Sequence, residues 1–126
     1  MSKINEGIEE SICSEDVYHL LRDNGCEVSS IINTEKGPTI CISHQLAMNW
    51  IFINFNFWIS IIPMDLDWFP IIVDCSNIHI IHGKTRMVPR KVKLDDEFYF
   101  PSSSNAYDEA IKYVLTKLIK NKNEQN

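Results

Sequence analysis

Two carboxylates, Asp65 and Asp67, stand two residues apart between Pro63 and Pro70, and Asp74 follows nearby. Paired carboxylates can hold a divalent cation, or can act together as a general acid and a general base. The two prolines predict a loop or a single turn between them, because proline interrupts the pairing of strands. Acids in such a loop more often serve solubility, so the sequence does not favour a catalytic or metal-binding role for this pair.

Cysteines and histidines are the other residues that could carry chemistry. Cys75, His79 and His82 lie close together in the sequence, and Cys41 precedes His44 by three residues. Zinc sites typically use closely paired cysteines or histidines at helical spacing, and neither pattern occurs. We therefore expect no metal and no cofactor, and we interpret the four cysteines as reduced, buried thiols.

The stretch from Trp50 to Ile62 alternates at a period of two residues and predicts a long β-strand. One face of this strand would be wholly apolar, and the other would mix large aromatic with uncharged polar side chains. The apolar face comprises Ile51, Ile53, Phe55, Phe57, Ile59 and Ile61. The mixed face comprises Trp50, Phe52, Asn54, Asn56, Trp58 and Ser60. Large apolar surfaces seldom stay exposed on monomers, so the second face needs a covering layer or a partner.

Two amphipathic helices are predicted, one near each end of the chain. Ser14 is an N-cap candidate for the first, and Asn24 with Gly25 would end it. In the second, Asn105 and Asp108 approximate a capping box. The apolar stripe of this second helix comprises Tyr107, Ala110, Ile111, Val114, Leu115, Leu118 and Ile119.

The segments between the helices predict an antiparallel sheet of about five to six strands. A hairpin is expected around the turn at residues 34–37, with residues 44–49 as a connection to the long strand. Shorter strands should follow at 71–73, 78–82, 87–94 and 98–100, with a hairpin turn at 82–84. The predicted class is α+β, a single domain over residues 1–126 with both helices packed on the sheet and with possible fraying at 1–12 and 121–126.

Charge is unevenly distributed along the 126 residues, whose formal net charge is −5. Residues 1–37 carry eight acids against three bases, residues 38–83 carry three acids and no base, and residues 84–126 carry nine bases against six acids. An acidic first two-thirds argues against nucleic acid as the main partner, because phosphate binding needs a basic face. The acidic amino end resembles no secretion leader, and no apolar run approaches a membrane span, so we expect a cytoplasmic chain with no membrane partner.

A small, acidic chain without a catalytic motif favours a non-enzymatic protein-binding module. The most specific form of this hypothesis is a small bacterial immunity protein that neutralises a basic toxin by direct binding. Tryptophan and phenylalanine supply large contact areas in interfaces, and acids would meet the basic partner. The expected contact residues are Trp50, Trp58, Asp65, Asp67, Trp68 and Phe69.

Two alternatives remain open. The element order, a helix, a hairpin, further strands and an amphipathic terminal helix, resembles the secretion-chaperone type of α/β domain over most of the chain. That resemblance implies an acidic chaperone that forms a homodimer. The other alternative is a small hydrolase or nuclease that uses Asp65 and Asp67 with His44, His79 and His82.

Overall fold

The computed structural model describes residues 11–94 and 98–119. Its elements are, in chain order, α2 (Glu15–Asp23), β1 (Ser30–Thr34), β2 (Gly37–Cys41), α3 (His44–Phe55), β3 (Phe57–Met64), β4 (Asp67–Asp74), β5 (Ile78–Ile81), β6 (Lys84–Met87), β7 (Arg90–Lys91), α4 (Ser103–Tyr113) and the π-helical turn η1 (Val114–Leu118). The expected α+β class is confirmed, with one helix towards each end. The strands form three small antiparallel sheets rather than one larger sheet: β1–β2, β3–β4–β7 and β5–β6.

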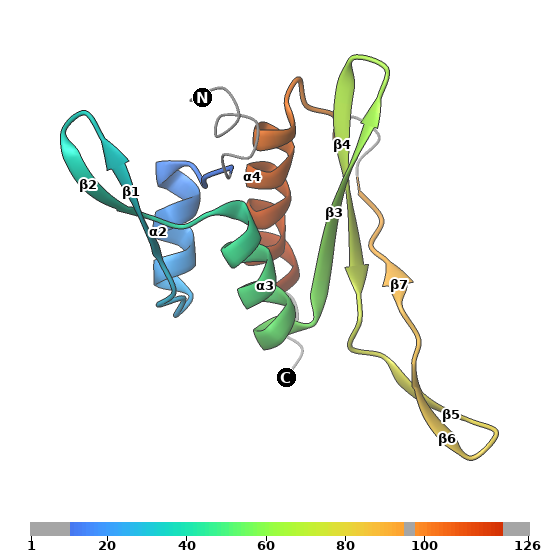
Figure 1. The fold of residues 1–126 in the computed structure, drawn as a ribbon. Coiled ribbons are helices and arrows are strands. Elements are labelled where there is room, and N and C mark those ends of the chain that lie inside the picture. The colour runs from blue at the N-terminus through green and yellow to red at the C-terminus, as the bar shows by residue number, and fades with distance from the viewer. Residues whose placement is uncertain (1–10, 95–97, 120–126) are drawn as a thin grey trace, which may run out of the picture.

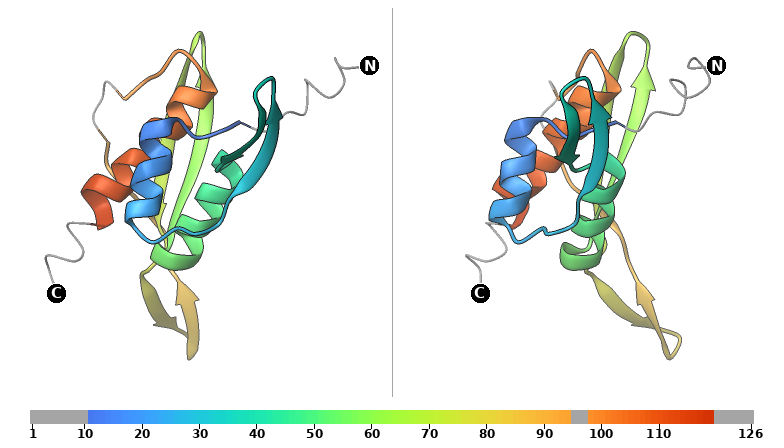
Figure 2. Two further views of the ribbon diagram at one scale, coloured as in Figure 1. Left: turned by 90° about the vertical axis from the view of Figure 1, so that its left-hand side faces the viewer. Right: turned by 60° about the vertical axis from the view of Figure 1, so that its left-hand side comes forward.

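All three helices lie on one side of the β3–β4–β7 sheet (Figures 1 and 2). Helices α3 and α4 contact the sheet directly, and α2 packs on α4. None of the described helices is long and apolar enough to cross a membrane. The expected fraying at residues 1–10 and 121–126 lies outside the described residues, whereas Ile12 forms a bridge with Ser43.

Helix α4 supplies the largest part of the core. Ala106, Ala110, Ile111 and Val114 are fully buried, and Leu115 and Ile119 nearly so, which confirms most of the predicted apolar stripe. The predicted capping box is wrong, because the N-cap is Ser102, whose hydroxyl accepts a hydrogen bond from the backbone N–H of Asn105. The carboxylate of Asp108 is therefore not used in the helix cap and can form other hydrogen bonds.

Helix α3 is the main departure from the predicted secondary structure. It replaces the expected connection at 44–49 and the first half of the expected strand. Ser43 caps its first turn by accepting a hydrogen bond from the N–H of Leu46, and Asn56 ends it in the left-handed conformation at φ 62°. Because this helix is apolar on several sides, its sequence also satisfies a period of two residues, and periodicity alone cannot separate the two structures.

Of the predicted loop or single turn between Pro63 and Pro70, the structure has the turn, at residues 65 and 66, and the flanking strands run through both prolines. Strand β3 continues through Pro63 to Met64, and β4 begins at Asp67. The turn between them places Asp65 at φ 54°, a conformation that aspartate tolerates better than most residues. Pro63 lies in β3, an outer strand of the sheet, and Pro70 lies in the part of β4 that does not pair with β7. At both positions a residue without a backbone N–H can be accommodated in the strand.

The first helix and the two shorter hairpins agree with the sequence. The hydroxyl of Ser14 accepts from the N–H of Val17, and α2 ends at Asn24, before Gly25 at φ 95°. Gly37, at φ 106°, and Gly83, at φ 75°, occupy the turns of the β1–β2 and β5–β6 hairpins. The strand expected at 87–94 is shorter, since only β7 pairs with β4, and the one expected at 98–100 is a single bridge from Phe100 to Trp68.

Substitutions of Ile51 and Ile53 distinguish the helix from the strand. The two residues would share a face in a strand, but in α3 Ile51 is fully buried and Ile53 is 76% exposed. We expect Ile51→Ala to lower the free energy of unfolding by about 2 to 4 kcal/mol, and Ile53→Ala by less than about 0.5 kcal/mol. Urea denaturation measures both values, and equal losses would contradict the helix.

Candidate functional site

The outer face of the β3–β4–β7 sheet is open to solvent. Phe57 and Ile59 point towards the helices and are 3% exposed, whereas Trp58 points the opposite way and is 42% exposed. The strand register places Trp58 beside Val73. We call the side chains on this outer surface the open sheet face: Trp58, Ser60, Ile62, Phe69, Ile71 and Val73. Apart from Trp58 they are half-buried. The ring of Trp58 contacts Phe52 of α3 edge-on and that of Phe69 contacts Tyr99, but no described helix or strand lies across the rest of the face (Figures 1 and 2).

The turn between β3 and β4 extends the open sheet face with apolar and acidic side chains. Leu66 is 92% exposed and Met64 47% exposed, and Asp65 and Asp67 beside them are also exposed. A surface that combines exposed apolar side chains with carboxylates at one end suits a protein contact better than a catalytic site.

The residues expected to bind a partner do not all lie on this surface. Trp58 and Phe69 share the open sheet face, and Asp65 and Asp67 lie at its end. Trp50 is instead part of α3, where it packs half-buried against the core and contacts the ring of Phe55 edge-on. Trp68 and Phe69 are adjacent residues of β4, so their side chains lie on opposite faces of the sheet. Four of the six predicted residues therefore form one surface.

A groove adjoins the open sheet face where the chain after β7 leaves the edge of β4. The backbone of Val92 bonds to Ile72 and that of Phe100 bonds to Trp68, so Pro70 faces the gap between these contacts. Proline has no N–H to donate there. The groove has a volume of about 370 Å³ and is lined by Phe69, Pro70, Lys91, Val92, Lys93, Leu94, Phe98 and Tyr99.

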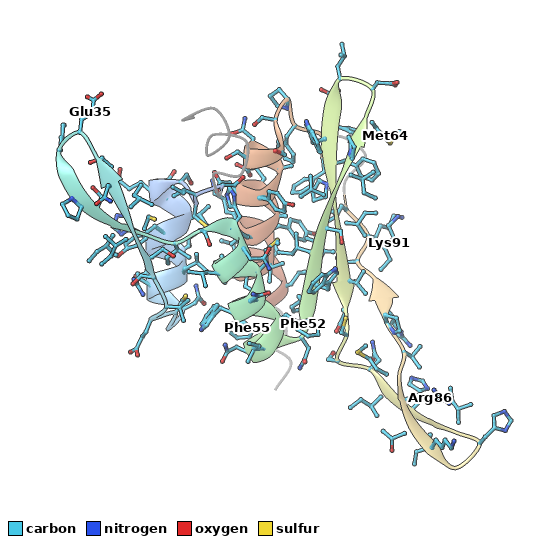
Figure 3. All side chains as sticks on the ribbon, viewed as in Figure 1. Glu35, Phe52, Phe55, Met64, Arg86 and Lys91 are labelled. Carbon is cyan, nitrogen blue, oxygen red and sulfur yellow. The ribbon has the colours of Figure 1, made fainter. Side chains whose placement is uncertain are left out.

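The residues of the hydrolase or nuclease alternative are not brought together. Asp65 and Asp67 flank the turn at one end of the sheet, whereas His79 and His82 belong to the β5–β6 hairpin at the other end (Figure 1). Figure 3 shows the same separation between Met64 and Arg86. His44 is buried at the start of α3. These five acid and base groups cannot act on one substrate in this arrangement.

A second cluster with chemical potential lies inside the protein. Cys13, His44 and Asp108 come from the segment before α2, the first turn of α3 and the second turn of α4, and their donor atoms lie within 4.8 Å of one another. His44 Nε2 lies 2.8 Å from Asp108 Oδ1, which also accepts the backbone N–H of Ser14 at 3.1 Å. Two backbone hydrogen bonds, from Cys13 to Ile42 and from His44 to Ser11, hold the segments in place.

One nitrogen of His44 has no hydrogen-bond partner among the described residues. The side chain is 2% exposed, its ring stacks on Tyr107 with centroids 5.2 Å apart, and Nδ1 is buried and unpaired. Since an ionised carboxylate can only accept, the Nε2 atom that meets Asp108 carries the proton, and Nδ1 presents a lone pair. A buried polar atom without a partner costs free energy and calls for an explanation.

Cysteine, histidine and aspartate can form a nucleophilic triad, but Cys13 is not activated for that role. Burial and the negative charge of Asp108 raise the pKa of its thiol to about 12. The reactive form of cysteine is the thiolate, and activated cysteines have a lowered pKa and partial exposure. Cys13 is 8% exposed. The cluster therefore resembles a structural or ligand-holding site more than a hydrolase site.

None of the four cysteines forms a disulfide with another described residue. Cys13, Cys26 and Cys41 are buried as expected, whereas Cys75 is half-buried. The sequence suggested Cys41 and His44 as a possible metal-binding pair. His44 does belong to the buried cluster, but the cysteine of the cluster is Cys13. Cys13 and Asp108 escaped notice because they lie 31 and 64 positions from His44. The only local signal was that Ser14 and Ser43 predict helix starts beside Cys13 and His44.

Comparisons with protein-family models, with curated protein sequences and with solved structures gave no match to this chain. The functional argument therefore rests on the residues themselves.

The buried thiol of Cys13 should make stability fall at alkaline pH. Its folded pKa of about 12 lies above the ordinary value of 9.0, so its contribution is complete below pH 9 and is lost as the pH rises towards 12. Between these limits we expect the free energy of unfolding of the wild type to fall more steeply than that of Cys13→Ala, by up to about 1.4 kcal/mol per pH unit. Urea denaturation at pH 8, 9 and 10 measures both slopes, and equal slopes would contradict the burial of this thiol.

Proposed function

We propose that this protein is a cytoplasmic, non-enzymatic protein-binding module that docks one partner protein on its open sheet face. The most specific form of the proposal is a small bacterial immunity protein that neutralises a toxin by direct binding. The observation that carries the proposal is the uncovered outer surface of the β3–β4–β7 sheet, where Trp58 is 42% exposed.

The chemistry of the open sheet face favours a protein partner. Its contiguous side chains are mainly aliphatic and aromatic, and tryptophan is one of the residues most enriched among interface anchors. Lys91 of β7 lies beside Val73 on this face, but it is surrounded by aliphatic and aromatic side chains, and Asp65 and Asp67 are exposed at the turn. This is not the basic surface that phosphate binding needs, so the proposal includes no nucleic acid. It includes no membrane partner either.

Charge indicates which protein surface would fit. Asp65 and Asp67 are exposed at one end of the open sheet face, and the chain has a net charge of −5. The matching partner surface has an apolar centre with basic side chains on the side that meets these two aspartates. Opposite charges of this kind speed the encounter and fix the orientation of docking.

Co-expression tests the toxin proposal. We expect the reading frame next to the gene for this protein to arrest growth when it is expressed alone, and the wild-type protein to restore growth. Trp58→Ser should lose protection and bind the purified toxin about 30-fold more weakly or worse, because removal of a central tryptophan typically costs 2 kcal/mol or more. Ile53→Ser is the matched control, since Ile53 is 76% exposed on α3 and not on the sheet.

A paired variant tests the charge argument in the same assay. Asp65→Asn with Asp67→Asn should slow association several-fold at low salt and make little difference at high salt, because exposed charges are screened. Equal protection by Trp58→Ser and Ile53→Ser would exclude the open sheet face as the docking surface. A harmless neighbouring reading frame whose product does not bind would overturn the toxin proposal.

The β5–β6 hairpin favours a second candidate, a dimeric secretion-chaperone-like protein. Both strands are exposed along their whole length. Ile78 pairs with Met87 and Ile80 with Thr85, so Ile78, Ile80 and Met87 share one apolar face, exposed by 53 to 78%. A lone two-stranded hairpin is marginally stable in water. A second copy that covered this face would give the homodimer that the chaperone alternative requires.

Sedimentation equilibrium decides between the two candidates. The chaperone alternative predicts a dimer that Ile80→Lys converts to a monomer, because a buried lysine without a partner is costly at an interface. Leu66→Lys is the control, since Leu66 is also exposed but lies at the opposite end of the sheet. A wild-type monomer throughout a concentration series would exclude the dimer.

A further inference from the structure

We propose that Cys13, His44 and Asp108 form a binding site for a divalent transition-metal ion of the zinc class. The inference is independent of the proposed docking surface, because the three residues lie among the helices and not on the sheet. It rests on the donor set, on the placement of the three residues and on the unpaired nitrogen of His44.

The donor set selects the metal. A thiolate, an imidazole nitrogen and a carboxylate oxygen are the three ligand types that proteins offer to Zn²⁺, with metal distances of about 2.0 to 2.3 Å. Mg²⁺ and Ca²⁺ prefer ligand sets made of oxygen alone, so a sulfur donor argues against both ions. The site therefore fits zinc, or cobalt as its spectroscopic substitute.

The three side chains would have to move only a little to bind one metal ion. In a tetrahedral zinc site, neighbouring donors are roughly 3.3 to 3.6 Å apart, given the bond lengths of such sites. The donors of Cys13, His44 and Asp108 already lie within 4.8 Å of one another, and the His44 to Asp108 contact of 2.8 Å would open slightly. Rotations of side chains are sufficient for such changes, while the backbone hydrogen bonds to Ile42 and Ser11 stay in place.

The unpaired Nδ1 of His44 is the second observation that points to a ligand. Hydrogen bonding leaves this imidazole with a lone pair that is buried and unused. An ion that takes Nδ1 is the partner that this atom lacks, while Nε2 keeps its bond to Asp108 and the carboxylate orients the ring, as in a carboxylate–histidine–metal relay. An ion that takes Nε2 displaces the proton to Nδ1 and has all three side chains as ligands.

A cavity beside His44 gives an ion access to this side chain. It has a volume of about 210 Å³ and is lined by Ser11, His44, Gln45, Met48 and Tyr107. Three protein ligands with a remaining open position describe a zinc site that holds a water molecule. On binding, Cys13 forms the metal–sulfur bond as a thiolate, and its proton passes to the solvent, so affinity should rise with pH.

Cobalt titration of the metal-free, full-length protein tests the site. We expect one Co²⁺ per chain, with a thiolate-to-cobalt charge-transfer band in the near ultraviolet and visible bands of tetrahedral intensity, both removed by an equivalent of Zn²⁺. Cys13→Ser should abolish the charge-transfer band, and His44→Gln and Asp108→Asn should each weaken binding about tenfold or more. Cys75→Ser, which removes a thiol on the connection after β4, should titrate as the wild type does.

A labelling experiment on the wild type keeps the proposal falsifiable if the variants do not fold. Zinc should slow the alkylation of Cys13 by at least about tenfold under conditions that partly unfold the protein, while Cys75 reacts at an unchanged rate, as mass spectrometry of the peptides would show. Binding without a charge-transfer band, full binding by Cys13→Ser, or equal protection of Cys75 would each overturn the site.

Discussion

The burial of α4 is the constraint on which the rest of the structure depends. Its fully buried residues face the sheet on one side and the other helices on the other, and they include Ala106 and Ala110, whose small side chains let neighbouring backbones approach closely. Because one helix serves both contacts, all helices gather on one side of the β3–β4–β7 sheet (Figure 2). The open sheet face is the direct consequence, since none of the helices described in residues 11–94 and 98–119 lies on its side of the sheet.

The cluster of Cys13, His44 and Asp108 is the polar counterpart of this apolar core. It joins three segments at the point where α2 and α3 begin and where α4 passes them. Apolar burial has no direction, but a hydrogen bond between His44 and Asp108 fixes how the helices are aligned. An ion at this position would strengthen the same junction. The open sheet face and the buried cluster therefore depend on different parts of the fold, the first on the sheet and the second on the helices.

Local chemistry made parts of the fold predictable. The α2 cap at Ser14, the turns at Gly37 and Gly83 and the stripe of α4 depend on residues close in sequence, and the structure agrees with the expectation for each. The second half of the predicted strand was also correct, because Phe57 and Ile59 point to the core while Trp58 points outwards. That alternation placed Trp58 on an uncovered face before any fold was considered.

The sequence by itself determined the α+β class, the positions of two helices and two hairpins, and the face of β3 on which Trp58 lies. Only the tertiary structure decided that residues 44–55 form a helix, because an almost wholly apolar segment satisfies both periods until its neighbours select one. It alone brought Cys13, His44 and Asp108 together, since residues 31 and 64 positions apart meet only when the helices pack. Short-range patterns fix local conformation, and long-range packing fixes which side chains become neighbours.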